Sequence, residues 1–255
     1  MQGVRVKETM LVPGRYCGPA KSGNGGYVAG ALAHELGNTG ARAVAVTLRQ
    51  PPPLDATMRI TETETGLELA FGGALVAQAS LVDRAIEPVE AVSWDEAVAA
   101  TASYPGLTSH PFPDCFACGT QRQDGLRIFP GEVPPVREGQ TRLAAPWVPD
   151  PTLAADFHEY DDPAPRACLA ATWSALDCIG GWAGDLTERL MVLGQMTAII
   201  DELPVQGEQH VVTGEHRGSE GRKTFTASTL HDADGRIVGR AEHVWVAVDP
   251  ATFNG

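Results

Sequence analysis

Apolar and polar residues alternate along most of this chain, in two blocks that each follow a stretch with helical spacing. A period of two is typical of antiparallel strands that bury one face, and the turn-forming tetrapeptides at 218–221 and 232–235 indicate hairpins. Shorter segments at 4–11 and 125–129 are expected to supply the strand that precedes each block. The pattern therefore predicts two meanders, with strands at 43–49, 57–63 and 67–82, broken at 72–73, and then at 190–201, 207–217, 223–231 and 236–248.

Helical spacing marks the stretch 26–36, where the large apolar residues recur every three or four positions. Small residues at 29, 30 and 33 leave room for a sheet to pack close to this helix. The glycines at 23, 25 and 26 precede it, and we expect them to allow positive φ and close backbone approach. A second helix is predicted at 166–183 and a shorter one at 94–102.

The two blocks share one plan: a strand, a loop, one long helix and then a meander. They share little residue identity, so the repeat is one of architecture. We predict an N-terminal half at 1–88, a linker with a short helix at 89–110 and a C-terminal half at 111–255. Because exposed sheet edges need covering, the halves are expected to pack as a pseudo-dimer with their sheets joined edge to edge.

Three segments resemble the hotdog-fold, thioesterase-like superfamily. Asn24-Gly25-Gly26 stands where many members carry His-Gly-Gly, and Cys115-Phe116-Ala117-Cys118-Gly119 with Gly125-Leu126 is similar to a segment of some thioesterase-like sequences. Residues 176–183 resemble a helix of uncharacterised, mostly actinobacterial double-hotdog proteins. The resemblance implies an α+β fold, a tandem double hotdog in which each half is a curved antiparallel sheet wrapped around one central helix.

Hotdog proteins include acyl-CoA thioesterases, hydratases and non-catalytic acyl binders, so the site must decide the chemistry. The chain lacks the Asp-x-Asn-Pro-x-His run of the hydratase branch. We therefore predict an acyl-CoA thioesterase, and the alternative is a non-catalytic acyl or acyl-CoA binding module. Other enzyme classes fit less well, because Val28 replaces the third glycine of a dinucleotide fingerprint and no Gly-x-Ser-x-Gly is present.

Asp177 is the first candidate for a catalytic residue. It lies in the middle of a predicted helix among Trp173, Leu176 and two glycines, where a carboxylate is costly unless it is paired. Burial would raise its pKa towards that of a general base. The structural alternatives are an Asp bonded to Ser174 or to backbone, or one that faces solvent, and Glu35 is the next candidate for the base.

The resemblance also implies partners for Asp177. In the thioesterase branch, amides at a helix N-terminus polarise the thioester carbonyl, and here these would belong to Gly25 and Gly26. Asn24 would orient the substrate, and Tyr27 and Trp173 would line its binding site. Because hotdog sites lie between subunits, the loop of the first half is expected to face the helix of the second.

Charge limits the partners. The formal net charge of −13 argues against nucleic acid, so an anionic ligand needs a local basic patch. Arg217, Arg222 and Lys223 flank one predicted hairpin and could hold the phosphates of coenzyme A, although charges at hairpin tips are often only solvated.

No apolar run approaches the length of a membrane span and the N-terminus lacks a secretion signal, so we expect a cytoplasmic protein without a membrane partner. Whether the whole chain forms homo-oligomers stays open.

Cysteine spacing gives weak support for a metal. Cys115-x-x-Cys118 without a second pair is half a zinc site, and a buried pair of structural thiols fits it better. The five cysteines, an odd number without framework spacing, favour reduced thiols. The sequence thus predicts no metal, and no cofactor apart from the coenzyme A of the substrate.

Overall fold

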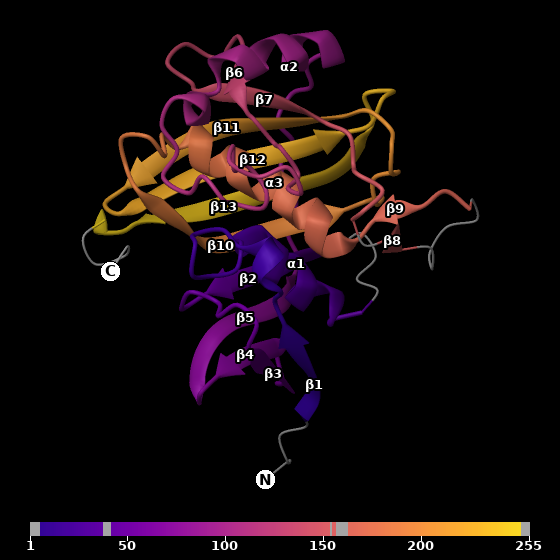
Figure 1. Cartoon of the computed structure of the whole chain (residues 1–255), viewed down its shortest axis with the longest axis vertical. Coiled ribbons are helices and arrows are strands. Elements are labelled where there is room, and N and C mark those ends of the chain that lie inside the picture. Colours follow the sequence, from indigo (N-terminus) through magenta and orange to yellow (C-terminus); the bar gives the residue numbers. More distant parts are fainter. Residues whose placement is uncertain (1–5, 38–41, 154, 157–162, 251–255) are drawn as a thin grey trace.

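The computed structural model describes residues 6–37, 42–153, 155–156 and 163–250, and in these ranges one large antiparallel sheet carries two long helices on one face (Figure 1). The helices are α1 (Gly25–His34), α2 (Trp94–Ala100) and α3 (Leu169–Ala183), with short 3₁₀ turns at Gly14–Tyr16, Thr101–Ser103 and Pro105–Leu107. The strands of the first half are β1 (Val6–Leu11), β2 (Ala43–Leu48), β3 (Thr57–Glu62), β4 (Leu67–Phe71) and β5 (Ala74–Val82). Those of the second half are β6 (Gly131–Glu132), β7 (Arg142–Trp147), β10 (Met191–Ile200), β11 (His210–Glu220), β12 (Lys223–His231) and β13 (Ile237–Ala247), while β8 (Ala155–Asp156) and β9 (Arg166–Ala167) form a separate small ladder.

The strand order repeats itself. Among the described residues the sheet has 11 strands, in the order β1-β3-β4-β5-β2-β10-β13-β12-β11-β7-β6. Strand β1, helix α1 and strands β2 to β5 are connected in the same way as β7, α3 and β10 to β13. The two halves differ in sequence but have the same topology, and the division into 1–88, 89–110 and 111–255 stays a prediction.

The halves meet where β2 pairs with β10. The ladder runs from Val44 opposite Ala198 to Thr47 opposite Gln195, and the Gln195 side chain donates a 2.9 Å hydrogen bond to Thr47 Oγ1. Beyond this point β10 has a bulge between Leu193 and Gln195. The pairing of β2 with β10 ends there, beneath the N-terminus of α1.

The two long helices touch through small residues. A Cβ atom on Gly26 would lie 2.5 Å from Asp177 Cβ, and one on Gly30 would lie 2.7 Å from Trp173 Cβ. Such distances would force the helices apart, so these glycines permit the close crossing of α1 and α3. The expectation of positive φ is wrong for this loop, because residues 23, 25 and 26 all avoid that region. Close approach is what these positions require.

Helix α2 covers the other face of the sheet at β7. Leu143 and Ala145 belong to the main core, whereas Ala144 between them packs against Ala97 and Ala100 of α2. Since neighbouring residues of a strand point to opposite faces, α2 and α3 lie on opposite sides of β7. A capping box starts α2: Glu96 N–H donates to Ser93 Oγ and the Ser93 N–H donates to the Glu96 carboxylate. None of the described helices is both long and apolar enough to cross a membrane.

The strand predicted at 125–129 is wrong. Arg127 has a φ of 58°, which interrupts an extended chain. The amides of Leu126 and Ile128 donate instead to the carbonyls of Phe116 and Ala117, so this segment pairs with the cysteine loop. β7 occupies the predicted place. The second long helix begins at 169, and the hairpin expected at 218–221 turns at 221–222. Residues 4 and 5 of the first predicted strand lie outside the described ranges.

Candidate active site between the two central helices

A cavity of about 380 Å³ lies where β2 and β10 end their pairing. It is bounded by the loop before α1, by the cysteine loop at 115–118, by the middle of α3 and by the ends of β10 and β13. Its polar side chains are those of Ser22, Asn24, Arg49, Gln50, Asp177 and three cysteines, and Gly25 adds backbone atoms. Its remaining wall is mainly apolar, from Leu48, Pro51, Pro52, Phe112, Leu186, Met191, Val192, Leu193, Trp245, Val246 and Val248.

Asp177 is 2% exposed and borders this cavity from α3. Its Oδ2 atom accepts a 2.8 Å hydrogen bond from the Gly26 amide and a 3.3 Å bond from Asn24 Nδ2. Its Oδ1 atom has no hydrogen-bond partner among the described residues. One carboxylate oxygen is thus fixed by the first half of the chain, while the other is left to a ligand or to water.

Burial raises the pKa of Asp177 to about 7. Desolvation is the main cause, because a charged carboxylate is disfavoured away from water. The hydrogen bond from the Gly26 amide opposes this shift, as does that from Asn24, whereas the nearby Cys115 adds to it. Asp177 is thus a buried carboxyl group bonded to backbone, the Gly26 amide, as one of the structural alternatives expected. The alternatives of a solvent-facing Asp or one bonded to Ser174 do not hold, since Asp177 is buried and the Ser174 hydroxyl donates to the Ala170 carbonyl.

Asn24 serves two elements at once. Its Oδ1 atom accepts from the Tyr27 amide, which makes it the N-cap of α1. This contact directs Nδ2 to the other side, towards Asp177 and the sulfur atoms of Cys115 and Cys178. A capping oxygen and a donor nitrogen on one short side chain explain the use of Asn at this position.

The first amides of α1 have different partners. Gly26 donates to Asp177, Tyr27 donates to the Asn24 side chain, and Val28 donates to the Asn24 carbonyl. The Gly25 amide has no acceptor in the part of the chain that the structure describes. The pair of oxyanion donors expected at Gly25 and Gly26 is therefore reduced to Gly25, which borders the cavity.

Two expected substrate contacts lie outside the cavity wall. Trp173 is buried beneath Gly30 at the helix crossing, where it packs the two halves together. Tyr27 stacks on Tyr16 with 3.9 Å between the ring centroids. Glu35, the alternative base, caps the C-terminal end of α1, at the opposite end from Asn24. These side chains support the fold around the site.

The basic residues separate into two groups. Arg217 lies within β11, where it pairs with Glu215 and Glu242 and donates to the Glu87 carbonyl. Its guanidinium is thus already occupied, contrary to the expectation of a phosphate ligand.

Arg222 and Lys223 keep their predicted position at a hairpin. Lys223 is opposite the cavity residue Val246, and the Arg222 carbonyl accepts from Ala247. Sequence reasoning missed Arg49, which borders the cavity at the end of β2, is exposed and has no side-chain partner in the described ranges. Arg49 reaches the cavity because β2 and β10 separate beside it, and the sequence carries no signal for that separation.

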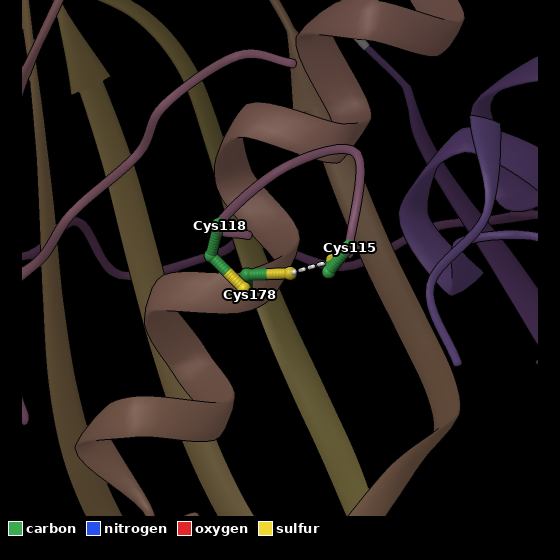
Figure 2. Close-up of side chains that lie close together, drawn as sticks. All are labelled: Cys115, Cys118 and Cys178. Atoms are coloured by element: carbon green, nitrogen blue, oxygen red, sulfur yellow. Dashed lines mark hydrogen bonds between the residues drawn. The ribbon is translucent and has the colours of Figure 1, made fainter. Parts of the chain in front are cut away.

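Three cysteines meet at the cavity (Figure 2). Cys115 and Cys118 come from the loop that follows the linker, and Cys178 comes from α3 beside Asp177. Their sulfur atoms all lie within 4.8 Å of one another, and those of Cys115 and Cys178 are 3.6 Å apart. The Cys115-x-x-Cys118 spacing predicted that the first two cysteines lie together. Cys178 could not be added to them from the sequence, because it fits the apolar pattern of the helix.

Comparison with known proteins places the fold. No protein-family model matches the chain, and no curated protein matches it. A tesB protein of Mycobacterium avium subspecies paratuberculosis has a similar structure, with 10% identity over 96% of each chain and a TM-score of 0.60. The acyl-CoA thioesterase II TesB2 of Mycobacterium marinum has 13% identity over 98% of each chain and a TM-score of 0.57. A protein with a hot dog fold from Alicyclobacillus acidocaldarius has 14% identity, covers 97% of this chain and 96% of its own, and has a TM-score of 0.57.

The chain has a hotdog fold similar to that of thioesterase-like proteins, and the resemblance predicted from its sequence is confirmed at this level. Identities this low support an inference about the fold alone, so the chemistry must be argued from the residues of the site.

Proposed function

We propose that this chain is a tandem double hotdog that hydrolyses acyl-CoA thioesters in the cavity between α1 and α3. The observation that carries the proposal is the state of Asp177: a buried carboxyl group with Oδ2 held by two donors and Oδ1 without a partner among the described residues, at the wall of an apolar cavity. A general base must reach a water molecule and must be held in place, and this arrangement supports both requirements.

In the proposed reaction, Oδ1 of Asp177 accepts a proton from water as the water oxygen attacks the thioester carbon. The Gly25 amide donates to the carbonyl oxygen, where negative charge develops at the positive end of α1. The C–S bond then breaks, and the coenzyme A sulfur leaves with the proton that Asp177 took. The products are a carboxylic acid and free coenzyme A.

The cavity also supports an orientation for the substrate. Arg49 borders it on one side, and the Arg222–Lys223 hairpin pairs with the end of β13 that lines it on another. Phosphate groups bind to such exposed cations, so we place the nucleotide part of coenzyme A near them. The acyl group is assigned to the apolar wall formed by Leu48, Leu193 and Trp245.

The repeated topology supports the proposal that the chain is a tandem double hotdog. Asn24, Gly25 and Gly26 belong to the first half and Asp177 to the second, so the site needs both. Each half contributes one long helix, α1 or α3, to the crossing above the sheet. One chain therefore corresponds to the pair of subunits between which hotdog sites are expected.

The test uses the purified chain with acyl-CoA esters of short, medium and long chains. Release of coenzyme A is followed together with equilibrium binding of each ester. We expect turnover with at least one length class, and Asp177→Asn is expected to lose that turnover while it still binds. Binding without turnover in the parent chain would contradict hydrolysis and favour the non-catalytic acyl-CoA binding module. Neither binding nor turnover across the series would contradict both.

A further inference from the structure

The three cysteines at the cavity form a compact sulfur cluster outside the proposed reaction. Cys115, Cys118 and Cys178 are all buried, and each borders the cavity. A tetrahedral zinc ion with Zn–S bonds of about 2.3 Å places its sulfur ligands about 3.8 Å apart. The Cys115 and Cys178 sulfurs are 3.6 Å apart and all three lie within 4.8 Å of one another. The spacing therefore needs only small side-chain adjustments to surround a metal.

The loop around Cys115 has the donors that a thiolate needs. The backbone amides of Ala117 and Cys118 point at the Cys115 sulfur, and the turn closes with a bond from the Gly119 amide to the Cys115 carbonyl. Backbone N–H groups of this kind stabilise metal-bound sulfur.

Asn24 adds a third donor from another element. Its Nδ2 atom lies 3.7 Å from the sulfur of Cys115 and 3.7 Å from that of Cys178. The orientation of this amide is fixed independently, because its oxygen caps α1. N–H donors from two separate parts of the chain thus converge on one sulfur cluster. Apolar packing of three neutral thiols does not require this convergence.

We propose that Cys115, Cys118 and Cys178 bind one zinc ion as three thiolates, with the fourth ligand position open to the cavity. The ion ties the loop at 115–118 to the middle of α3, and a water molecule completes the tetrahedron. Each thiol gives up one proton to solvent on binding, so three protons leave for each zinc ion. Soft sulfur ligands select zinc over magnesium or calcium. The inference does not depend on the proposed hydrolysis, because its readout is metal content.

The test measures zinc in the full chain, purified without chelator, by elemental mass spectrometry. We expect about one zinc per chain in the parent and less than about a tenth of that in Cys178→Ser, since two remaining thiolates rarely hold structural zinc. Cys168→Ser is the matched control, because Cys168 lies at the start of α3 and outside the cluster. This variant should keep the zinc of the parent.

A second measurement uses the parent chain alone, so it does not depend on how a variant folds. Zinc is removed with a chelator under reducing conditions, and cobalt is added in its place. Absorption bands of tetrahedral cobalt and of thiolate-to-cobalt charge transfer are expected. Three thiols should also be slower to alkylate with zinc than without it. A chain that takes up neither metal when reduced, or in which Cys115 and Cys178 are found as a disulfide that excludes zinc, would overturn the proposal.

Discussion

The backbone amide of Gly26 donates a 2.8 Å hydrogen bond to the carboxylate of Asp177, which lies 151 residues further along the chain. The bond crosses the contact between α1 and α3, so it joins the two halves of the molecule at the cavity wall. It also fixes which carboxylate oxygen is held, Oδ2, and which has no hydrogen-bond partner among the described residues, Oδ1.

Replacing Asp177 by Asn tests the role of the unpartnered Oδ1 oxygen. The amide oxygen of Asn can still accept from Gly26, so the fold and acyl-CoA binding should be retained. Turnover is expected to fall by about 10²- to 10⁴-fold, which is typical for the loss of a general base. The measurement is kcat for the best acyl-CoA ester, with unfolding temperature as a check. Glu35→Gln is the matched control and should keep parental turnover; equal rates for Asp177→Asn and the parent would remove Asp177 from the mechanism.

Replacing Gly26 by Ala tests the other end. The added Cβ would lie 2.5 Å from Asp177 Cβ and 2.8 Å from the Trp173 carbonyl oxygen, so α1 and α3 must move apart. Overpacking of this kind costs about 1–3 kcal/mol of the free energy of unfolding. Because the Asp177 carboxylate loses its position, kcat/KM should also fall.

A matched control for Gly26→Ala is Gly214→Ala on β11, where the new Cβ would lie 2.7 Å from Ile179 on the sheet side of α3. It should lower stability by a similar amount but keep the kcat of the folded protein. Denaturant unfolding and steady-state kinetics measure both effects. If Gly26→Ala were as stable and as active as the parent, the close helix crossing would not matter to the site.

Arg49 is predicted to bind the phosphates of coenzyme A. Arg49→Ala should raise the KM or Kd of acyl-CoA by about tenfold, the effect of losing one hydrogen bond to a charged group. The same acyl group on a short pantetheine thioester, which lacks the nucleotide, should be hardly affected. Arg59→Ala, at an exposed position of β3, is the control. Equal losses for both thioesters would contradict a phosphate contact.

We expect the stability of the fold to fall in acid because His243 is buried. It is fully buried, and desolvation lowers its pKa from 6.5 to about 3. The unfolded chain therefore binds a proton between these values that the folded chain does not, so stability should fall as pH falls from about 6.5 towards 3. The slope from this one group is about 1.4 kcal/mol per pH unit.

Denaturant unfolding at several pH values measures the slope. His243→Gln should show a shallower acid loss than the parent, whatever its stability at neutral pH. His34→Gln, at an exposed position near the end of α1, should keep the parental slope. Parallel pH curves for the parent and His243→Gln would contradict the assignment.

Much of the architecture could be predicted because its physical cause is local. Alternation and turn residues located β2 to β5 and β10 to β13, and the small residues of α1 indicated that something packs close to it. β7 was missed, because its residues are buried on both faces of the strand and the alternation is lost. The segment 125–129 has the alternation of a strand, yet the left-handed Arg127 turns it towards the cysteine loop.

The site could be predicted only in part. A carboxylate in an apolar helix and an Asn before a glycine pair are signals in the sequence, and the structure brings Asp177 and Asn24 together. Which acceptor each donor meets depends on how α1 and α3 cross. The hydrogen bond from the Gly26 amide to Asp177 could therefore not be predicted from the sequence. Arg217 was misplaced for a similar reason, because a bulge at 216–218 extends β11 beyond the expected turn.

The repeated strand order has a consequence for stoichiometry. Because the strand order matches in the two halves, α1 and α3 have corresponding places in the topology, and each N-cap has a corresponding position on the other helix. Asp177 is nine residues beyond the N-cap Cys168, and the residue nine beyond the N-cap Asn24 is the buried Ala33. The second position thus has a methyl group in place of the carboxyl group and a cysteine in place of the amide. Among the described residues only one of the two positions carries the carboxyl and amide groups of the proposed site, so one chain should bind one substrate molecule at saturation and a dimer of chains two.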